Sequence, residues 1–283
     1  MLVATTIRTT TLPNGEAIPV LGQGTWGMAE RKHPREHEIQ ALRVGLDLGL
    51  TLIDTAEMYA NGGAEKLVGE AIAGRREQVF LVSKVLPHNA SRRGTVNACE
   101  RSLRRLNTDH LDLYLLHWRE QIPLEQTISA FDALLREGKI RYWGVSNFDL
   151  SDMIELETLS GGNAVATDQV LYNLQRRGIE YDLLPWCQQH QIPVMAYSPI
   201  EQGRMLDHPT LREIADRHGA TPSQVALAWV LRQDRVVAIP RAGIAEHVRQ
   251  NRGALDIRLT SQDLALLDRD FPPPSGPQPL EML

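Results

Sequence analysis

The sequence predicts an α/β fold in which parallel strands and helices alternate around one closed barrel. Eight short apolar runs recur along the chain, and longer segments with apolar residues every three or four positions separate them. Alternation of this kind indicates a parallel sheet with crossover helices. Eight units over 283 residues fit a closed (β/α)8 barrel, or TIM barrel, better than an open doubly wound sheet. We therefore expect a single barrel domain spanning residues 1–283.

The strands are predicted in order from the apolar runs. An N-terminal β-hairpin comes first, because β-branched residues precede and apolar residues follow an Asn14-Gly15 turn. The eight barrel strands come next. Their residues are 20–24, 50–54, 79–85, 111–118, 140–147, 164–170, 192–198 and 236–241.

The helices are predicted from the intervals between these runs, several of which end in glycine, a favoured helix stop. The segments are 35–49, 63–74, 95–106, 124–138, 181–190, 211–219 with 222–233, and 246–255. One extra C-terminal helix, residues 261–271, follows the eighth unit. The Pro-rich tail at 271–279 has two interpretations, a fraying chain end or a flap over the site.

Composition narrows the partners of the protein. A net charge of -5 and a pI near 6.0 offer no basic face to nucleic acid and no polybasic anchor to a membrane, so small molecules are the expected partners. Cys99 and Cys187 lie far apart and lack matching histidines, which argues against a metal site and fits a reducing compartment. The sequence has no signal peptide and no apolar stretch of about 18 residues, so we expect a cytoplasmic location.

Polar side chains occur at the carboxyl ends of successive predicted strands. In a parallel barrel these ends form one rim, the face at which barrel enzymes place their active sites. Each residue alone has an ordinary structural explanation: an aspartate can cap a helix, a lysine can reach solvent, and a histidine can be buried in the core. Their recurrence at successive rim positions favours a site. The residues are Asp54, Lys84, His117, Ser146, Asn147, Gln169, Tyr197 and Ser198.

Tyr59, five residues after Asp54, completes a set suited to carbonyl reduction. A phenol with a pKa of about 10 is a poor acid until its anion is stabilised. Lys84 would stabilise that anion by Coulomb attraction, and Asp54 would supply the counter-charge that a buried ammonium needs. His117, as a neutral donor, would hydrogen-bond the carbonyl oxygen. The set predicts that Tyr59 donates a proton to a carbonyl that receives a hydride.

The motifs around these four residues resemble the aldo-keto reductases. The likeness also rests on GVSNF at 144–148, AYSP at 196–199 and IPRA at 239–242, and it covers nearly the whole chain. Segments such as LTLIDTAEMYANGGAEKLVGEA and SLRRLNTDHLDLYLLHW are most similar to the bacterial methylglyoxal-reductase branch. The resemblance implies an NADPH-dependent oxidoreductase with a TIM barrel, without a Rossmann fold, and with Tyr59 as general acid.

The resemblance also implies which residues bind NADPH. Tyr197 would stack on the nicotinamide, since an aromatic face can hold a flat ring and leave its other side open. At the 2′-phosphate the family has Lys, then Ser or Thr, and an Arg, where this chain has Arg241, Ala242 and His247. Arg241 keeps a charge, but the missing hydroxyl and second cation predict an NADPH preference with secondary use of NADH. The implied residues are Ser146, Asn147, Gln169, Tyr197, Ser198, Pro199, Ile239, Arg241, Ala242, His247 and Asn251.

The substrate pocket is expected above the nicotinamide, near Tyr59 and His117. Trp26, Met58 and Trp118 correspond to pocket positions in the family, although ordinary core packing would also explain the two tryptophans. The loops after the fourth and seventh strands are short, which predicts an open site for small aldehydes or dicarbonyls such as methylglyoxal. The family is mostly monomeric, so we expect a monomer.

Three other functions remain open. The protein could be a reductase or alcohol dehydrogenase for a larger ketone. Lys84 could form a Schiff base, as in class I aldolases, although Asp54 would raise the pKa that such a lysine needs lowered. A non-catalytic NADPH-binding regulatory module is the third, and the retention of all four catalytic positions argues against it. Borohydride trapping of an adduct would identify the aldolase, and cofactor binding without turnover would identify the module.

Overall fold

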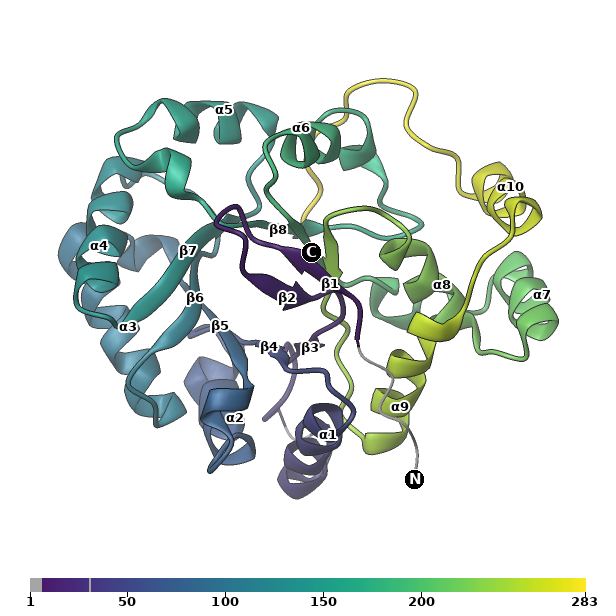
Figure 1. The fold of residues 1–283 in the computed structure, drawn as a ribbon, viewed down its shortest axis with the longest axis horizontal. Helices are drawn as coiled ribbons and strands as arrows, with labels where there is room; N and C mark the ends of the chain where they lie inside the picture. The colour runs from purple at the N-terminus through teal and green to yellow at the C-terminus, as the bar shows by residue number, and fades with distance from the viewer. Residues whose placement is uncertain (1–6, 31) are drawn as a thin grey trace.

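The computed structural model describes residues 7–30 and 32–283. At its centre lies one sheet of parallel strands whose order in space follows their order in sequence (Figure 1). Isolated parallel bridges join Leu21 to Ala238 and Gly24 to Arg241, so the last strand returns to the first and the predicted barrel closes. The strands are β3 (Gln23–Gly24), β4 (Leu52–Asp54), β5 (Phe80–Val85), β6 (Leu111–Leu116), β7 (Ile140–Ser146), β8 (Asp168–Leu171), β9 (Val194–Tyr197) and β10 (Val236–Ala238).

Helices surround the strands and bury their apolar faces against the outside of the barrel (Figure 1). The interval before β10 holds two helices, as its spacing predicted, and the extra C-terminal helix α10 packs against the first of them, α7. The helices are α1 (Arg35–Asp47), α2 (Gly63–Ala71), α3 (Arg92–Leu106), α4 (Leu124–Arg136), α5 (Leu150–Thr158), α6 (Leu183–Gln189), α7 (Pro209–His218), α8 (Pro222–Leu231), α9 (Ala245–Gly253) and α10 (Ser261–Asp270).

The sequence pattern did not predict α5, which fills the interval between β7 and β8. Its residues Leu150, Met153 and Ile154 have helical spacing, but the apolar stretch is short, and only Met153 and Leu156 of this helix are buried. The usable signal lies at its start, because the side chains of Asp149 and Asp152 form a reciprocal capping box with the backbone.

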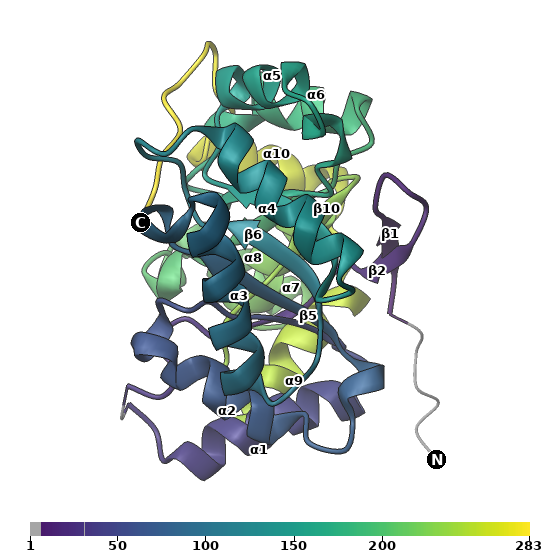
Figure 2. The same cartoon turned by 90° about the vertical axis from the view of Figure 1, so that its left-hand side faces the viewer.

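The inside of the barrel is a separate apolar core, closed at one end by the predicted hairpin. The hairpin strands β1 (Thr9–Thr11) and β2 (Ala17–Pro19) pair antiparallel. Leu12 and Ile18 of this hairpin pack among inward-facing strand residues such as Leu113 and Met195. Figure 2 shows the hairpin at the opposite end of the molecule from the C-terminus. The strands therefore begin at a sealed floor and end at an open rim.

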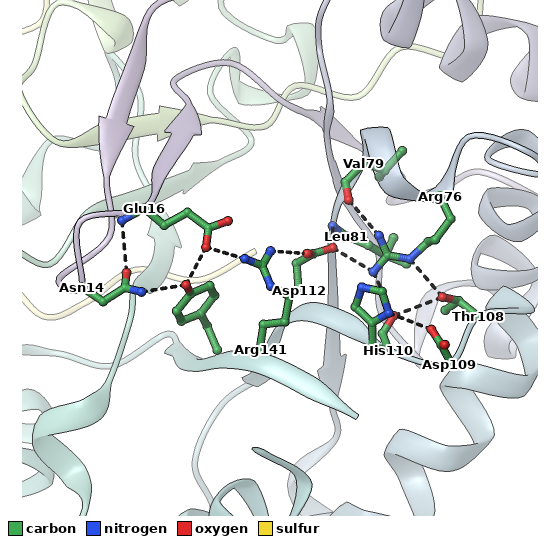
Figure 3. Close-up of polar contacts among 11 residues, drawn as sticks. Asn14, Glu16, Arg76, Val79, Leu81, Thr108, Asp109, His110, Asp112 and Arg141 are labelled. Atoms are coloured by element: carbon green, nitrogen blue, oxygen red, sulfur yellow. Dashed lines mark hydrogen bonds and ion pairs between the residues drawn. The ribbon is translucent and has the colours of Figure 1, made fainter. Parts of the chain in front are cut away.

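A network of charged groups fastens this floor to the strands (Figure 3). Glu16 of the hairpin accepts hydrogen bonds from Arg141 and from the Tyr142 hydroxyl. Arg141 also donates to Asp112, whose other oxygen accepts from Arg76 at 2.8 Å. The Asp112 carboxylate is almost fully buried, and its two arginine partners provide the compensation that a buried charge requires.

The C-terminal tail folds back over the rim. Leu280 packs on the main core, and Glu281 pairs with Arg176 at 2.5 Å. These contacts anchor the tail on the barrel, which favours the flap over the fraying end. In the part of the chain that the structure describes, every helix is too short or too polar to cross a membrane.

Candidate active site

Asp54 and Lys84 form an ion pair at the rim, where β4 and β5 lie side by side. The Lys84 ammonium donates to both carboxylate oxygens, at 2.7 and 2.8 Å, and to the carbonyl oxygen of Thr55 at 2.8 Å. The lysine side chain is 0% exposed. Burial lowers the pKa of Lys84, and the charge and hydrogen bonds of Asp54 oppose that shift. The carboxylate therefore stabilises the charged form of Lys84.

Tyr59 lies beside this pair, in the short helical turn η1 (Tyr59–Gly62) that follows β4. Its hydroxyl is 3.2 Å from Lys84 Nζ. Burial raises the pKa of Tyr59 well above its usual value, and the charge of Asp54 adds to the increase. Stabilisation of the Tyr59 anion by Lys84 stays a prediction, and in the resting site burial outweighs it. Asp54 compensates the ammonium, so burial dominates and Tyr59 keeps its proton at neutral pH.

His117 directly follows β6 and faces Tyr59, with ring centroids 5.8 Å apart and planes at 74°. Burial, reinforced by the Lys84 charge, lowers the pKa of His117 from 6.5 to about 2. The imidazole is consequently neutral at any physiological pH. Its Nδ1 is buried without a hydrogen-bond partner among the described residues.

Gln169 joins the Asp54–Lys84 pair to residues expected to contact the cofactor. Its side-chain amide donates to Asp54 Oδ1 at 2.9 Å, and its backbone carbonyl accepts from the Ser146 hydroxyl. Asn147, with a left-handed φ of 58°, donates to the carbonyl of His117 and accepts from the Tyr197 hydroxyl. The structure thus links these rim residues by direct hydrogen bonds. The contact between Gln169 and Asp54 was not predicted.

The residues expected at the 2′-phosphate gather around the end of β10 and the start of α9. Arg241 lies 3.4 Å from Glu38 Oε1, and its Nε is buried without a partner among the described residues. Glu38 is a buried residue of α1 that the sequence patterns did not single out. Ala242 is buried and His247 is exposed. The remaining expected cofactor contacts are Ser198, beside the rim, and the buried residues Pro199, Ile239 and Asn251.

Aromatic side chains form walls around Tyr59 and His117. The Trp26 ring is 5.1 Å from that of Tyr59, and Trp118 is 4.9 Å from His117. Trp26 is 50% exposed, which excludes ordinary core packing for this residue. Trp118 is partly exposed and donates a hydrogen bond to Glu120, and Met58 packs against the small apolar cluster that contains Tyr59. The three expected pocket residues therefore lie close to Tyr59 and His117.

Comparisons with other proteins show what this chain is similar to. A model described as the aldo/keto reductase family matches residues 20–269. Methylglyoxal reductase YeaE of Escherichia coli K12 is 57% identical, covering 94% of this chain and 96% of that protein. Glyoxal reductase of Bacillus subtilis is 34% identical, covering 97% of both. An aldo/keto reductase from Klebsiella pneumoniae, solved with NADP and acetate, is 53% identical with a TM-score of 0.95, covering 98% of this chain and 100% of that one. A structure of such an enzyme from the same organism with NADPH gives 52% identity and a TM-score of 0.96, covering 99% and 100%.

Proposed function

This chain belongs to the aldo/keto reductase family, and on that premise we propose that it reduces small aldehydes and dicarbonyls such as methylglyoxal, with Tyr59 as general acid. It is an NAD(P)H-dependent oxidoreductase that acts on carbonyl compounds. The observation that carries the assignment of Tyr59 is the buried Lys84 ammonium, which contacts both Asp54 and the Tyr59 hydroxyl.

The reaction needs a proton at the carbonyl oxygen while a hydride reaches the carbonyl carbon. NADPH, when bound, supplies the hydride. Because His117 is neutral, it can donate a hydrogen bond to the carbonyl oxygen without placing a second positive charge near Lys84. Tyr59 transfers its hydroxyl proton to that oxygen, which completes the alcohol. The phenolate left behind is held by Lys84 until solvent protonates it again.

Lys84 favours the charged product of this step over the resting phenol. Its ammonium has three N–H groups but lies near four oxygens, and the contact to Tyr59, at 3.2 Å, is the longest. A phenolate attracts the ammonium more strongly than a phenol does, so this contact strengthens as Tyr59 loses its proton. This contact therefore stabilises the transition state more than the ground state, and such a difference accelerates the reaction.

The rim residues support an extended cofactor. Gln169 uses its amide N–H groups on Asp54 and Met195, which leaves its carbonyl oxygen to accept from the nicotinamide carboxamide. Ser146 and Asn147 lie beside it, and Tyr197 would stack on the ring. Arg241 would bind the 2′-phosphate and Asn251 the adenine. Because Ala242 and His247 add no hydroxyl and no permanent cation, NADPH is favoured and NADH still serves.

Two observations favour small substrates. The related enzymes of E. coli and B. subtilis carry the names methylglyoxal reductase and glyoxal reductase, both of them for short dicarbonyl compounds. The rim wall formed by Trp26 is half exposed, so the site is open on that side.

The Schiff-base alternative loses support, because Lys84 is sealed from solvent by Asp54 and Thr55, whereas a Schiff-base lysine must reach its substrate. We also propose that the enzyme acts as a cytoplasmic monomer, with Cys99 and Cys187 reduced.

The substrate assignment is tested by comparing kcat/KM for methylglyoxal, glyoxal and a bulky steroid ketone with saturating NADPH. We expect the two dicarbonyls to be the better substrates. A higher kcat/KM for the bulky ketone would contradict the assignment of small substrates, while leaving the role of Tyr59 intact.

A further inference from the structure

The turn that follows Tyr59 has an unusual backbone. Ala60, Asn61 and Gly62 all have left-handed φ values, of 49°, 51° and 81°. Only glycine adopts this conformation freely, and runs of such residues persist only where the surroundings enforce them. Because Tyr59 precedes this turn directly, whatever holds the turn also fixes the direction of its phenol.

Arg105, from the last turn of α3, packs directly against this turn. A Cβ atom on Gly62 would lie 2.5 Å from Arg105 Cδ and 2.6 Å from its Nε, so the arginine occupies the space beside the glycine. The same guanidinium donates from Nε to Glu65 at 2.5 Å and from Nη2 to the Ser102 hydroxyl at 3.1 Å. These bonds fix the arginine in two directions.

Glu65 carries the connection on to the strand of Lys84. It lies in the first turn of α2, immediately after the left-handed residues, and its side chain is fully buried. Its second oxygen accepts from the Ser83 hydroxyl at 2.7 Å. Ser83 precedes Lys84 in β5, with its side chain on the opposite face of the strand. One hydrogen-bond network therefore connects the turn that follows Tyr59 with the strand that carries Lys84, on the face of that strand opposite the Lys84 side chain.

We propose that Arg105 is a positioning residue for carbonyl reduction, which fixes the left-handed turn against β5 and so keeps the Tyr59 hydroxyl beside Lys84 Nζ. The proposal rests on the role of Tyr59 as general acid. A guanidinium suits this task because its planar fork serves Glu65 and Ser102 together while its stem covers Gly62. A lysine would keep the charge but would bind at a single point.

The test is Arg105→Lys, which leaves Glu65 with a counter-charge. We expect kcat for methylglyoxal to fall about tenfold or more, because small misplacements of a reacting group are costly. The Kd for NADPH should change less than about twofold, since the cofactor contacts are elsewhere. The solvent isotope effect on kcat should rise, because transfer of the Tyr59 proton becomes the slow step. Gly62→Ala places a methyl group against Arg105 and should displace the same turn, so it should give the same pattern. This second variant keeps the proposal testable if Arg105→Lys fails to fold.

Arg76→Lys is the matched control. Arg76 and Asp112 have side chains 15% and 5% exposed, close to the 19% and 0% of Arg105 and Glu65, but they lie at the sealed floor of the barrel (Figure 3). This variant should lose stability and keep its kcat and isotope effect. Normal kcat and isotope effect in Arg105→Lys and in Gly62→Ala would overturn the proposal. Full activity of Tyr59→Phe would instead overturn the proposed function, so the two failures are distinguishable.

Discussion

Gln169 donates from its side-chain amide to Asp54 Oδ1 over 2.9 Å, and this bond crosses the barrel because β8 and β4 are not neighbours in the sheet. The same oxygen accepts from Lys84 at 2.7 Å. Asp54 is thereby fixed by two donors from different strands. The carboxylate that compensates Lys84 is thus also tied to a residue expected to hold the nicotinamide, and the proposed cofactor site and proton donor would share one anchor.

The Asp54–Lys84 pair predicts a pattern in stability. Replacing one partner, in Asp54→Asn or Lys84→Met, leaves the other as an uncompensated buried charge and should cost about 3–5 kcal/mol of unfolding free energy. The double variant removes both charges and should be more stable than either single variant. Urea denaturation of the four proteins measures the coupling. Costs that simply add would contradict a compensated pair.

The position of Lys84 predicts an effect on rate as well. The Lys84→Met enzyme lacks the ammonium that holds the Tyr59 phenolate, so kcat should fall about 100- to 1,000-fold. The stabilised double variant with Asp54→Asn should remain as slow, which separates lost chemistry from lost stability. Steady-state kinetics with methylglyoxal, supported by NADPH titration, provides the measurement. Recovery of kcat in the double variant would remove Lys84 from the mechanism.

The pKa of His117 predicts how stability depends on pH. Its folded pKa is lowered from 6.5 to about 2, so below about pH 6.5 the unfolded chain binds a proton that the folded protein refuses. Stability therefore falls as pH drops through this window, by up to about 1.4 kcal/mol per unit, and this contribution is absent above it. His117→Gln removes the effect. As the pH is lowered from 7 to 4, the unfolding free energy of this variant should rise relative to that of the parent. A difference that stays constant over this range would show that His117 is not a buried neutral group in the folded protein.

Arg241 predicts selective loss of NADPH. Arg241→Met removes the cation expected at the 2′-phosphate, so the Kd for NADPH should weaken about tenfold or more while that for NADH stays nearly constant. Ala242→Ser with His247→Arg supplies the groups that this chain lacks and should shift preference the other way. Fluorescence titration with both cofactors decides the matter. Equal losses for NADPH and NADH would place the phosphate away from Arg241.

The order of strands and the residues at the rim could be predicted because both follow from local patterns. Apolar spacing marks the strands, and parallel topology brings their ends together whatever the details of packing. The nearness of Asp54 and Lys84 followed from that alone, whereas Tyr59 was added from the chemistry that the set suggests. The α5 helix was missed although Leu150, Met153 and Ile154 have helical spacing, because its apolar stretch is short and the capping box at its start was not used.

Contacts that depend on barrel closure could not be predicted. Gln169 and Asp54 are 115 positions apart, and nothing in either neighbourhood indicates the other. Glu38 and Arg241 meet only because β10 closes against β3. The upward net shift of the Tyr59 pKa could not be predicted for a related reason: it comes from burial and from the charge of Asp54, and both depend on the packing and distances of the folded chain, which the sequence does not contain.

The role of Tyr59 is tested most directly by a single-turnover measurement of NADPH oxidation by methylglyoxal in the parent and in Tyr59→Phe. Phenylalanine keeps the ring against Trp26 and His117 and removes only the hydroxyl. We expect the rate to fall at least about 100-fold with the Kd for NADPH unchanged, as for the loss of a general acid. A rate within about threefold of the parent, below the range of general acid catalysis, would show that the proton comes from another group.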